Sequence, residues 1–163
     1  MKIDIQKDWG KIKSHFRTCN RRNMHVVISS VDSDQMPTVT PIGSLFLNDD
    51  QTGFYFEKFA TKLRKSSEQN KNICVLAVNS RKWFWLKALF KGKFSDYPGV
   101  KLYGELGEKR DATPREYRAF QRRVQSTKRL KGYHYLWKDM AQIREIKFTK
   151  AEKINLGKMT KEL

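Results

Sequence analysis

Residues Thr38 to Asn79 read TVTPIGSLFLNDDQTGFYFEKFATKLRKSSEQNKNICVLAVN, and this stretch decides the fold. Its pattern predicts a strand, a turn, a second strand, a short basic helix and a third strand. Thr61 and Lys62 open the helix, where unpaired N–H groups and the positive end of the helix dipole already favour an anion. We therefore expect Thr61 and Lys62 to hold a phosphate.

An amphipathic helix is expected ahead of this stretch, because apolar residues recur there at positions i, i+3 and i+7. These residues are Trp9, Ile12 and Phe16. A basic connection over residues 20–23 then leads into an apolar strand over residues 25–31. The first strand of the sheet is thus predicted to follow a packed helix.

The remaining patterns favour antiparallel strands. Turn formers over 32–34 and 48–50 separate the first strands at hairpin-like spacing. Apolar residues alternate with polar ones over 146–148 and 154–156, which predicts two closing strands. We expect a mainly β, α+β fold: about six antiparallel strands closing into a small barrel with a few peripheral helices, in one domain over 1–163.

The composition is that of a basic protein that needs neither disulfides nor a structural metal. The 163 residues carry a formal net charge of +17, which attracts anionic partners without choosing among them. Cys19 and Cys74 are the only cysteines, too few for a disulfide framework or a four-cysteine zinc site. The charged N-terminal segment resembles no signal peptide, and no run of about 20 apolar residues occurs. We expect a soluble, cytoplasmic protein that does not associate with membranes.

Positive charge is concentrated between Lys109 and Lys131, where nine lysines and arginines face two acids for a local net charge of +7. Thr113-Pro114-Arg115-Glu116 has the form of a capping box with proline at the first helical position, so a helix is predicted to begin there.

This helix has two distinct faces. Tyr117, Phe120 and Val124 are expected to face the body of the protein. On the opposite face, three arginines recur at the same spacing and are expected to point toward solvent or a partner: Arg115, Arg118 and Arg122. A solvated basic face is the simpler interpretation, and a surface for a polyanion such as nucleic acid is the alternative.

No catalytic constellation of side chains is readable. His15, His25 and His134 are far apart in the sequence, and none lies at a catalytic spacing from a serine, cysteine or acid. We predict no metal site and leave the catalytic residues unassigned. The glycines match neither a dinucleotide fingerprint nor a P-loop, so redox chemistry would have to come from a bound cofactor.

The order of these segments resembles the pyridoxamine 5′-phosphate oxidase-like, FMN-binding split-barrel family, including its general stress protein branch. His25 to Val31 is similar to the first strand of that family, and Thr38 to Leu47 to the strand under the flavin ring. Phe54 to Phe56 and Val100 to Gly104 are similar to later strands. The resemblance covers most of the chain and implies FMN as the cofactor.

The resemblance also implies where FMN would bind. Gly43 lacks a β-carbon, so the ring could lie close to the strand and bond to backbone groups within Pro41, Ile42, Gly43 and Ser44. Thr61 and Lys62 would hold the phosphate, and Lys58 and Arg64 would add charge. From the residues alone, a bulge or bend at Gly43 and a solvated Lys62 are equally good explanations.

Three departures separate the chain from the authentic oxidases. Their Ser-Arg-Lys phosphate clamp corresponds to Thr61-Lys62-Leu63, which lacks the second cation. Their Arg-Gln before the Val-Arg-Ile-x-Gly strand is replaced by Pro98-Gly99, and their C-terminal Arg-Leu-x-Pro is absent. We expect a protein that is not a pyridoxamine-phosphate oxidase.

The resemblance further implies a homodimer with the flavin at its interface. The apolar stretch from Lys82 to Lys91 is too hydrophobic to leave exposed and would suit the core or that interface, with a membrane anchor or base-stacking surface as alternatives. The predicted function is an FMN-binding oxidoreductase acting on an unidentified small substrate. The alternative is a non-enzymatic basic module that binds a polyanion or another cofactor, either haem or a deazaflavin.

Overall fold

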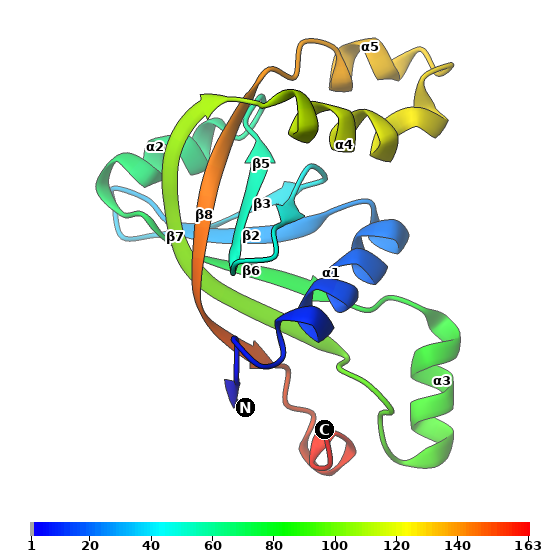
Figure 1. The fold of residues 1–163 in the computed structure, drawn as a ribbon. Coiled ribbons are helices and arrows are strands. Elements are labelled where there is room, and N and C mark those ends of the chain that lie inside the picture. Colours follow the sequence, from blue (N-terminus) through cyan, green and yellow to red (C-terminus); the bar gives the residue numbers. More distant parts are fainter. Residues whose placement is uncertain (1) are drawn as a thin grey trace.

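The structure, a computed structural model, describes residues 2–163. Within that range the chain forms eight strands and five α-helices, with two short 3₁₀ turns (Figure 1). The strands are β1 Lys2–Ile3, β2 Val26–Val31, β3 Pro37–Ile42, β4 Phe46–Leu47, β5 Thr52–Phe56, β6 Asn72–Val78, β7 Gly99–Asp111 and β8 Gln142–Lys153. The helices are α1 Trp9–Asn23, α2 Thr61–Gln69, α3 Lys82–Lys91, α4 Pro114–Val124 and α5 Gly132–Trp137, and the 3₁₀ turns are Gln125–Thr127 and Gly157–Thr160.

All strand pairs are antiparallel, as the hairpin spacing predicted. The strands follow the order β3-β2-β6-β7-β8-β5-β4, and β1 pairs with β8 beside this path. β7 and β8 are the longest strands, and both are strongly curved (Figure 1). Register shifts in their pairing fall at Tyr103/Gly104 and Leu106/Lys109, where bulges increase the bend.

The predicted α+β fold of antiparallel strands with peripheral helices is confirmed, with two corrections to the expected barrel. The sheet has eight strands, and it is not closed, because β3 and β4 lie at the two ends of its path. Only Gly43, Ser44 and Leu45 separate these strands in sequence, and four residue steps span at most about 14 Å. The sheet therefore curls until its ends approach each other, and we call Gly43–Leu45 the seam.

The strand predicted from Thr38 to Leu47 is thus two strands, interrupted at the seam. The cause is a contact distant in sequence: the Ser44 hydroxyl accepts a hydrogen bond from Phe56 N at 3.1 Å and donates to Phe56 O at 3.3 Å. The strand predicted over 154–156 is also wrong, because β8 ends at Lys153 and Leu156 is exposed.

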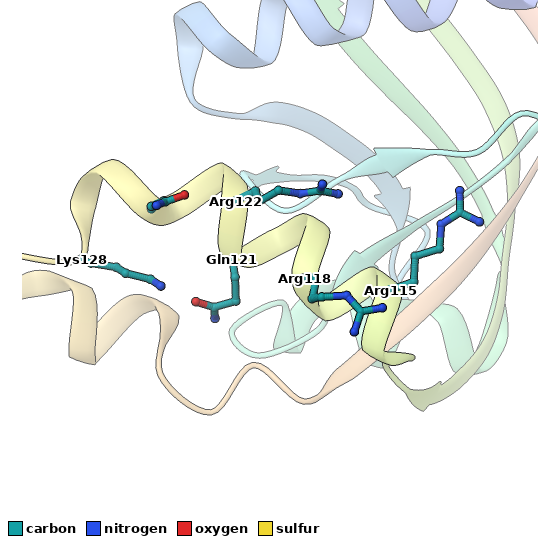
Figure 2. A pocket seen from close by; sticks show the side chains of 6 residues that line it. Arg115, Arg118, Gln121, Arg122 and Lys128 are labelled. Carbon is teal, nitrogen blue, oxygen red and sulfur yellow. The ribbon is translucent and has the colours of Figure 1, made fainter.

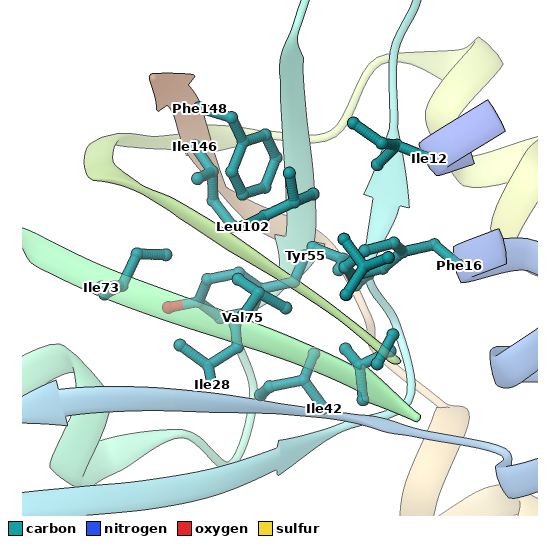
Figure 3. Packing of buried hydrophobic residues seen from close by; sticks show 14 of the residues in the cluster. Ile12, Phe16, Ile28, Ile42, Tyr55, Ile73, Val75, Leu102, Ile146 and Phe148 are labelled. Atoms are coloured by element: carbon teal, nitrogen blue, oxygen red, sulfur yellow. The ribbon is translucent and has the colours of Figure 1, made fainter. Parts of the chain in front are cut away.

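The main core lies between α1 and the curved sheet. Trp9, Ile12 and Phe16 are all buried, which confirms the predicted amphipathic helix. Figure 3 shows Ile12 and Phe16 beside side chains of several strands, among them Tyr55 and Leu102. The connection predicted over 20–23 is wrong, because α1 continues to Asn23.

A second core joins α4 to β5 and β8. The predicted capping box is present: the Thr113 hydroxyl accepts from Glu116 N at 3.3 Å, and Glu116 Oε2 accepts from Thr113 N at 2.8 Å. Phe120 and Val124 are buried as expected, and the Phe120 ring lies 4.6 Å from that of Phe56. Tyr117 was expected to be inward, but 43% of it is exposed.

Helix α3 lies at one end of the molecule, and α4 and α5 lie at the other (Figure 1). Ala88 is its one buried residue, whereas Trp83 is 80% and Phe90 94% exposed. The apolar stretch therefore does not lie in the core of its own chain, and of the two expected places the subunit interface stays a prediction. None of the helices within residues 2–163 is both long and apolar enough to cross a membrane.

Candidate functional site

The start of α2 is where the sequence predicted it, at Thr61. Leu63 anchors the helix because its side chain is fully buried, and α2 packs against β2 and β3. The first helical hydrogen bond runs from Arg64 N to Ala60 O at 2.9 Å, so the N–H groups of Lys62 and Leu63 precede it. They are the donors that a helix N-terminus offers to an anion.

Three predicted side chains surround these donors. Thr61, Lys62 and Arg64 are all exposed, and neither cation makes a hydrogen bond or ion pair within residues 2–163. The Thr61 hydroxyl donates to Phe59 O at 3.3 Å, which leaves its oxygen able to accept. Lys65, which the sequence reasoning missed, is also exposed and lies one helical turn after Thr61. Its i, i+4 spacing from Thr61 was the signal that could have found it.

Lys58 has a different role from the one expected. Its ammonium group donates to the carbonyl oxygens of Lys138 at 2.5 Å and Tyr135 at 3.4 Å. These carbonyls lie at the C-terminal end of α5, where a cation is favourable. The structure therefore places Lys58 as a link between α5 and the loop before α2.

The residues expected to border the flavin ring, Pro41 to Ser44, differ in their exposure. Pro41 is exposed on β3, an edge strand, whereas Ile42 and Ser44 are buried. A β-carbon added to Gly43 would lie 2.9 Å from Met24 O and 3.6 Å from the Trp137 ring. The missing side chain of Gly43 thus makes room for its own chain, in agreement with the explanation by a bend.

Arg123 holds the seam in place from α4. Its guanidinium donates to Leu45 O at 2.6 Å and Gly43 O at 3.2 Å, and it lies 3.5 Å from the centre of the Phe46 ring. Burial lowers the pKa of Arg123 to about 10. The sequence reasoning counted Arg123 with the basic surface and missed this role, although its i, i+3 spacing from the inward residue Phe120 was a signal that could have found it.

Ser44 links the seam to the end of β5, because it is bonded to Phe56, five residues before α2 begins. The donors at the start of α2 fit a phosphate: two backbone N–H groups, a hydroxyl and nearby free cations. A planar ring fits the outer edge of β3, beside which no strand lies within residues 2–163, but it does not fit against the α-carbon of Gly43. The residues therefore suit FMN at its phosphate end and leave the edge of β3 for its ring.

Two hollows in the protein lie away from these residues. One, of about 300 Å³, runs along α4, and the other, of about 440 Å³, lies between the β4–β5 hairpin and β7 and β8. Within residues 2–163 no three His, Cys, Asp or Glu side chains are grouped to hold a metal.

The histidines are similarly dispersed. His15 is buried in α1, with Nε2 3.1 Å from Ala77 O, and burial lowers its pKa. His25 and His134 are exposed.

Comparison with known proteins finds similarity in structure but not in sequence. No protein-family profile matches the chain, and no curated protein matches it significantly. HupZ of Group A Streptococcus superposes with a TM-score of 0.58 at 17% identity, over 91% of this chain and 94% of HupZ. An FMN-binding protein from Syntrophomonas wolfei gives 0.51 at 19%, over 94% and 96%.

A Listeria innocua protein, provisionally assigned as a pyridoxamine 5′-phosphate oxidase, gives a TM-score of 0.53 at 13% identity, over 90% of this chain and 97% of that one. These proteins share the curled antiparallel sheet over nearly their whole length. This chain therefore has the split-barrel fold of the pyridoxamine 5′-phosphate oxidase-like proteins.

Proposed function

We propose that the protein binds FMN and uses it in an oxidation–reduction reaction on a small substrate. The observation that carries this proposal is the start of α2, which offers free donors and cations beside the seam of a split barrel. The similarity to an FMN-binding protein of the same fold supports it.

The residues have separate roles in this proposal. The N–H groups at the start of α2, with Thr61 and Lys62, hold the phosphate, and Arg64 and Lys65 add positive charge. Pro41 and the outer edge of β3 border the ring, while Arg123 fixes the seam by holding its carbonyls. Bound FMN supplies the transfer of a hydride or an electron pair, and the protein contributes binding and orientation.

A second copy of the chain completes this site in our proposal. Val39 on the edge strand β3 is 70% exposed, and Met36, just before the strand, is 61% exposed, so this edge offers an apolar patch to a partner. A partner subunit covering that patch would exclude water from the ring. Sedimentation equilibrium tests this, because a protein that stays monomeric when saturated with FMN would contradict it.

The visible absorption spectrum of the protein purified without added cofactor is the first test of function. A flavin spectrum, with FMN released on denaturation, is the expected result. A Soret band would indicate haem, and a deazaflavin would be identified in the released material. A colourless protein that also fails to take up FMN would overturn the proposal and favour the non-enzymatic basic module.

Lys62→Ala is expected to weaken FMN binding by about 1 to 3 kcal/mol, because it removes a charge-assisted contact to the phosphate. Titration of apoprotein, followed by flavin fluorescence, measures the change. Lys71→Ala is the matched control, since Lys71 is an exposed lysine just beyond the other end of α2. Equal affinities of the two variants for FMN would remove Lys62 from the site.

A further inference from the structure

The hollow along α4 is lined entirely by polar side chains. Its residues follow one face of the helix and continue past its end: Arg115, Arg118, Gln121, Arg122, Gln125 and Lys128. Figure 2 shows the three arginines along α4 and Lys128 beyond its C-terminal end. This surface, which we call the α4 groove, is distinct from the FMN site proposed at α2 and the seam.

The cations of the α4 groove are free, whereas three others in the same basic segment, Lys109, Arg110 and Arg123, are bonded within the protein. Within residues 2–163, the side chains of Arg115, Arg118, Arg122 and Lys128 make no hydrogen bond or ion pair. By contrast, Lys109 pairs with Glu57 and Arg110 with two glutamates. The local charge of +7 is therefore divided between paired structural cations and a free row.

The nearby acids are already occupied. Glu116 lies on another side of α4, where Arg110 holds it at 2.8 Å and lowers the pKa of its carboxyl to about 2. Asp49 is close enough to feel the charge of Arg115, but its carboxylate is bonded to Lys13. No carboxylate lines the α4 groove, so an incoming anion would meet uncompensated positive charge.

The spacing of the row fits a linear chain of anions. At about 1.5 Å per residue, Arg115 and Arg122 are separated by about 10 Å along the helix axis. Phosphates on one nucleic-acid strand advance about 3.4 Å per nucleotide along a duplex, so the row covers about three of them. Gln121 and Gln125 add neutral hydrogen-bonding groups between the charges.

The chemistry of the groove distinguishes a nucleic acid from a lipid surface. Peripheral membrane binding uses apolar side chains that enter the bilayer, and none lines the α4 groove. We propose that the α4 groove binds the phosphodiester backbone of nucleic acid without sequence specificity. This site does not depend on FMN binding.

Fluorescence anisotropy with labelled DNA and RNA duplexes of about 20 base pairs, at several salt concentrations from about 50 to 200 mM, tests the proposal on the full chain. The groove variant is Arg115→Gln/Arg118→Gln/Arg122→Gln. Its control is Arg17→Gln/Arg21→Gln/Arg22→Gln, which removes the same charge from exposed positions on α1.

The groove variant is expected to lose at least about tenfold in affinity, and its salt slope should fall by about 3, because roughly 0.9 counterions are released per phosphate contact. The control should stay within about threefold of the unmodified protein. Circular dichroism and FMN titration of the groove variant should match those of the unmodified protein, which separates loss of the site from loss of the fold.

Three results would overturn the proposal. The first is that the unmodified protein binds neither nucleic acid. The second is an equal loss of affinity in both variants, which would mean that net charge alone drives binding. The third is that the groove variant loses at least as much affinity for anionic phosphatidylserine vesicles or polyglutamate as it loses for DNA and RNA.

Discussion

Replacing Glu57 by glutamine is expected to lower the free energy of unfolding by about 3 to 5 kcal/mol, the range typical of breaking a buried ion pair. The Glu57 carboxylate is only 3% exposed, yet it receives bonds from Arg144 at 2.9 and 3.1 Å and from the Tyr55 hydroxyl at 3.2 Å. Lys109 adds a cation at 3.8 Å. Burial also raises the pKa of Tyr55, so its hydroxyl remains a donor to Glu57.

The effect arises because glutamine leaves the Arg144 charge without its counter-ion in a site that is only 14% exposed. Urea denaturation measures the change. Glu162→Gln is the control, because Glu162 forms a 2.9 Å pair with Lys93 in which both side chains are largely exposed. Such pairs contribute at most about 1 kcal/mol. Equal losses in the two variants would show that the buried network does not stabilise the fold.

Gly104→Ala is expected to destabilise the protein by about 3 kcal/mol, at the upper end of the usual cost of overpacking. The added β-carbon would overlap Lys147 O and lie 3.0 Å from the α-carbon of Phe148. Both atoms belong to the backbone of β8, so a change of rotamer cannot relieve the contact. β7 and β8 would have to separate at the bulge that bends them.

The control for this substitution is Gly10→Ala. Gly10 lies in the first turn of α1, and an added β-carbon would have no neighbour within 4 Å. We expect alanine at this position to leave the stability of the protein unchanged or to raise it by up to about 1 kcal/mol, because it restricts the unfolded chain and favours the helix. Thermal unfolding of both variants measures the difference. A loss below about 1 kcal/mol for Gly104→Ala would mean that the strands separate easily.

Features encoded by neighbouring residues were predictable from the sequence. The capping box at Thr113 and Glu116 requires only a three-residue spacing, and it forms as expected. The buried stripe of Trp9, Ile12 and Phe16 follows from helical periodicity alone. The start of α2 at Thr61 was likewise predicted from the local sequence pattern.

Features that depend on distant contacts were not predictable. The break in the strand after Ile42 requires Ser44 to meet Phe56, and the carbonyl of Leu45 to meet Arg123 from far along the chain. No local pattern signals either contact. The site shows the same limit: Lys58 has the right charge and place for a phosphate, but the fold brings the end of α5 to it.

The sequence shows which residues are charged, but only the fold shows which of them are bonded within the protein and which are free at the surface. Arg110 and Arg123 belong to the same basic segment as Arg118, yet the first two have partners inside the protein and the third faces outward. The net charge of the segment gives only the total for all of these residues. The position of each side chain decides which of them can meet a partner molecule.

The two prolines of β3 determine what can attach to the edge of the sheet. Proline has no N–H to donate, and within strands it occurs where that group would face away from the neighbouring strand. The backbone amide positions of Pro37, Val39 and Pro41 alternate with those that face β2, and they point toward the open edge of the sheet. Because the prolines have no N–H, Val39 is the sole N–H donor along this edge of β3. An incoming strand would find too few donors to form a ladder, and the open end of the sheet is thereby protected against aggregation through edge-to-edge pairing.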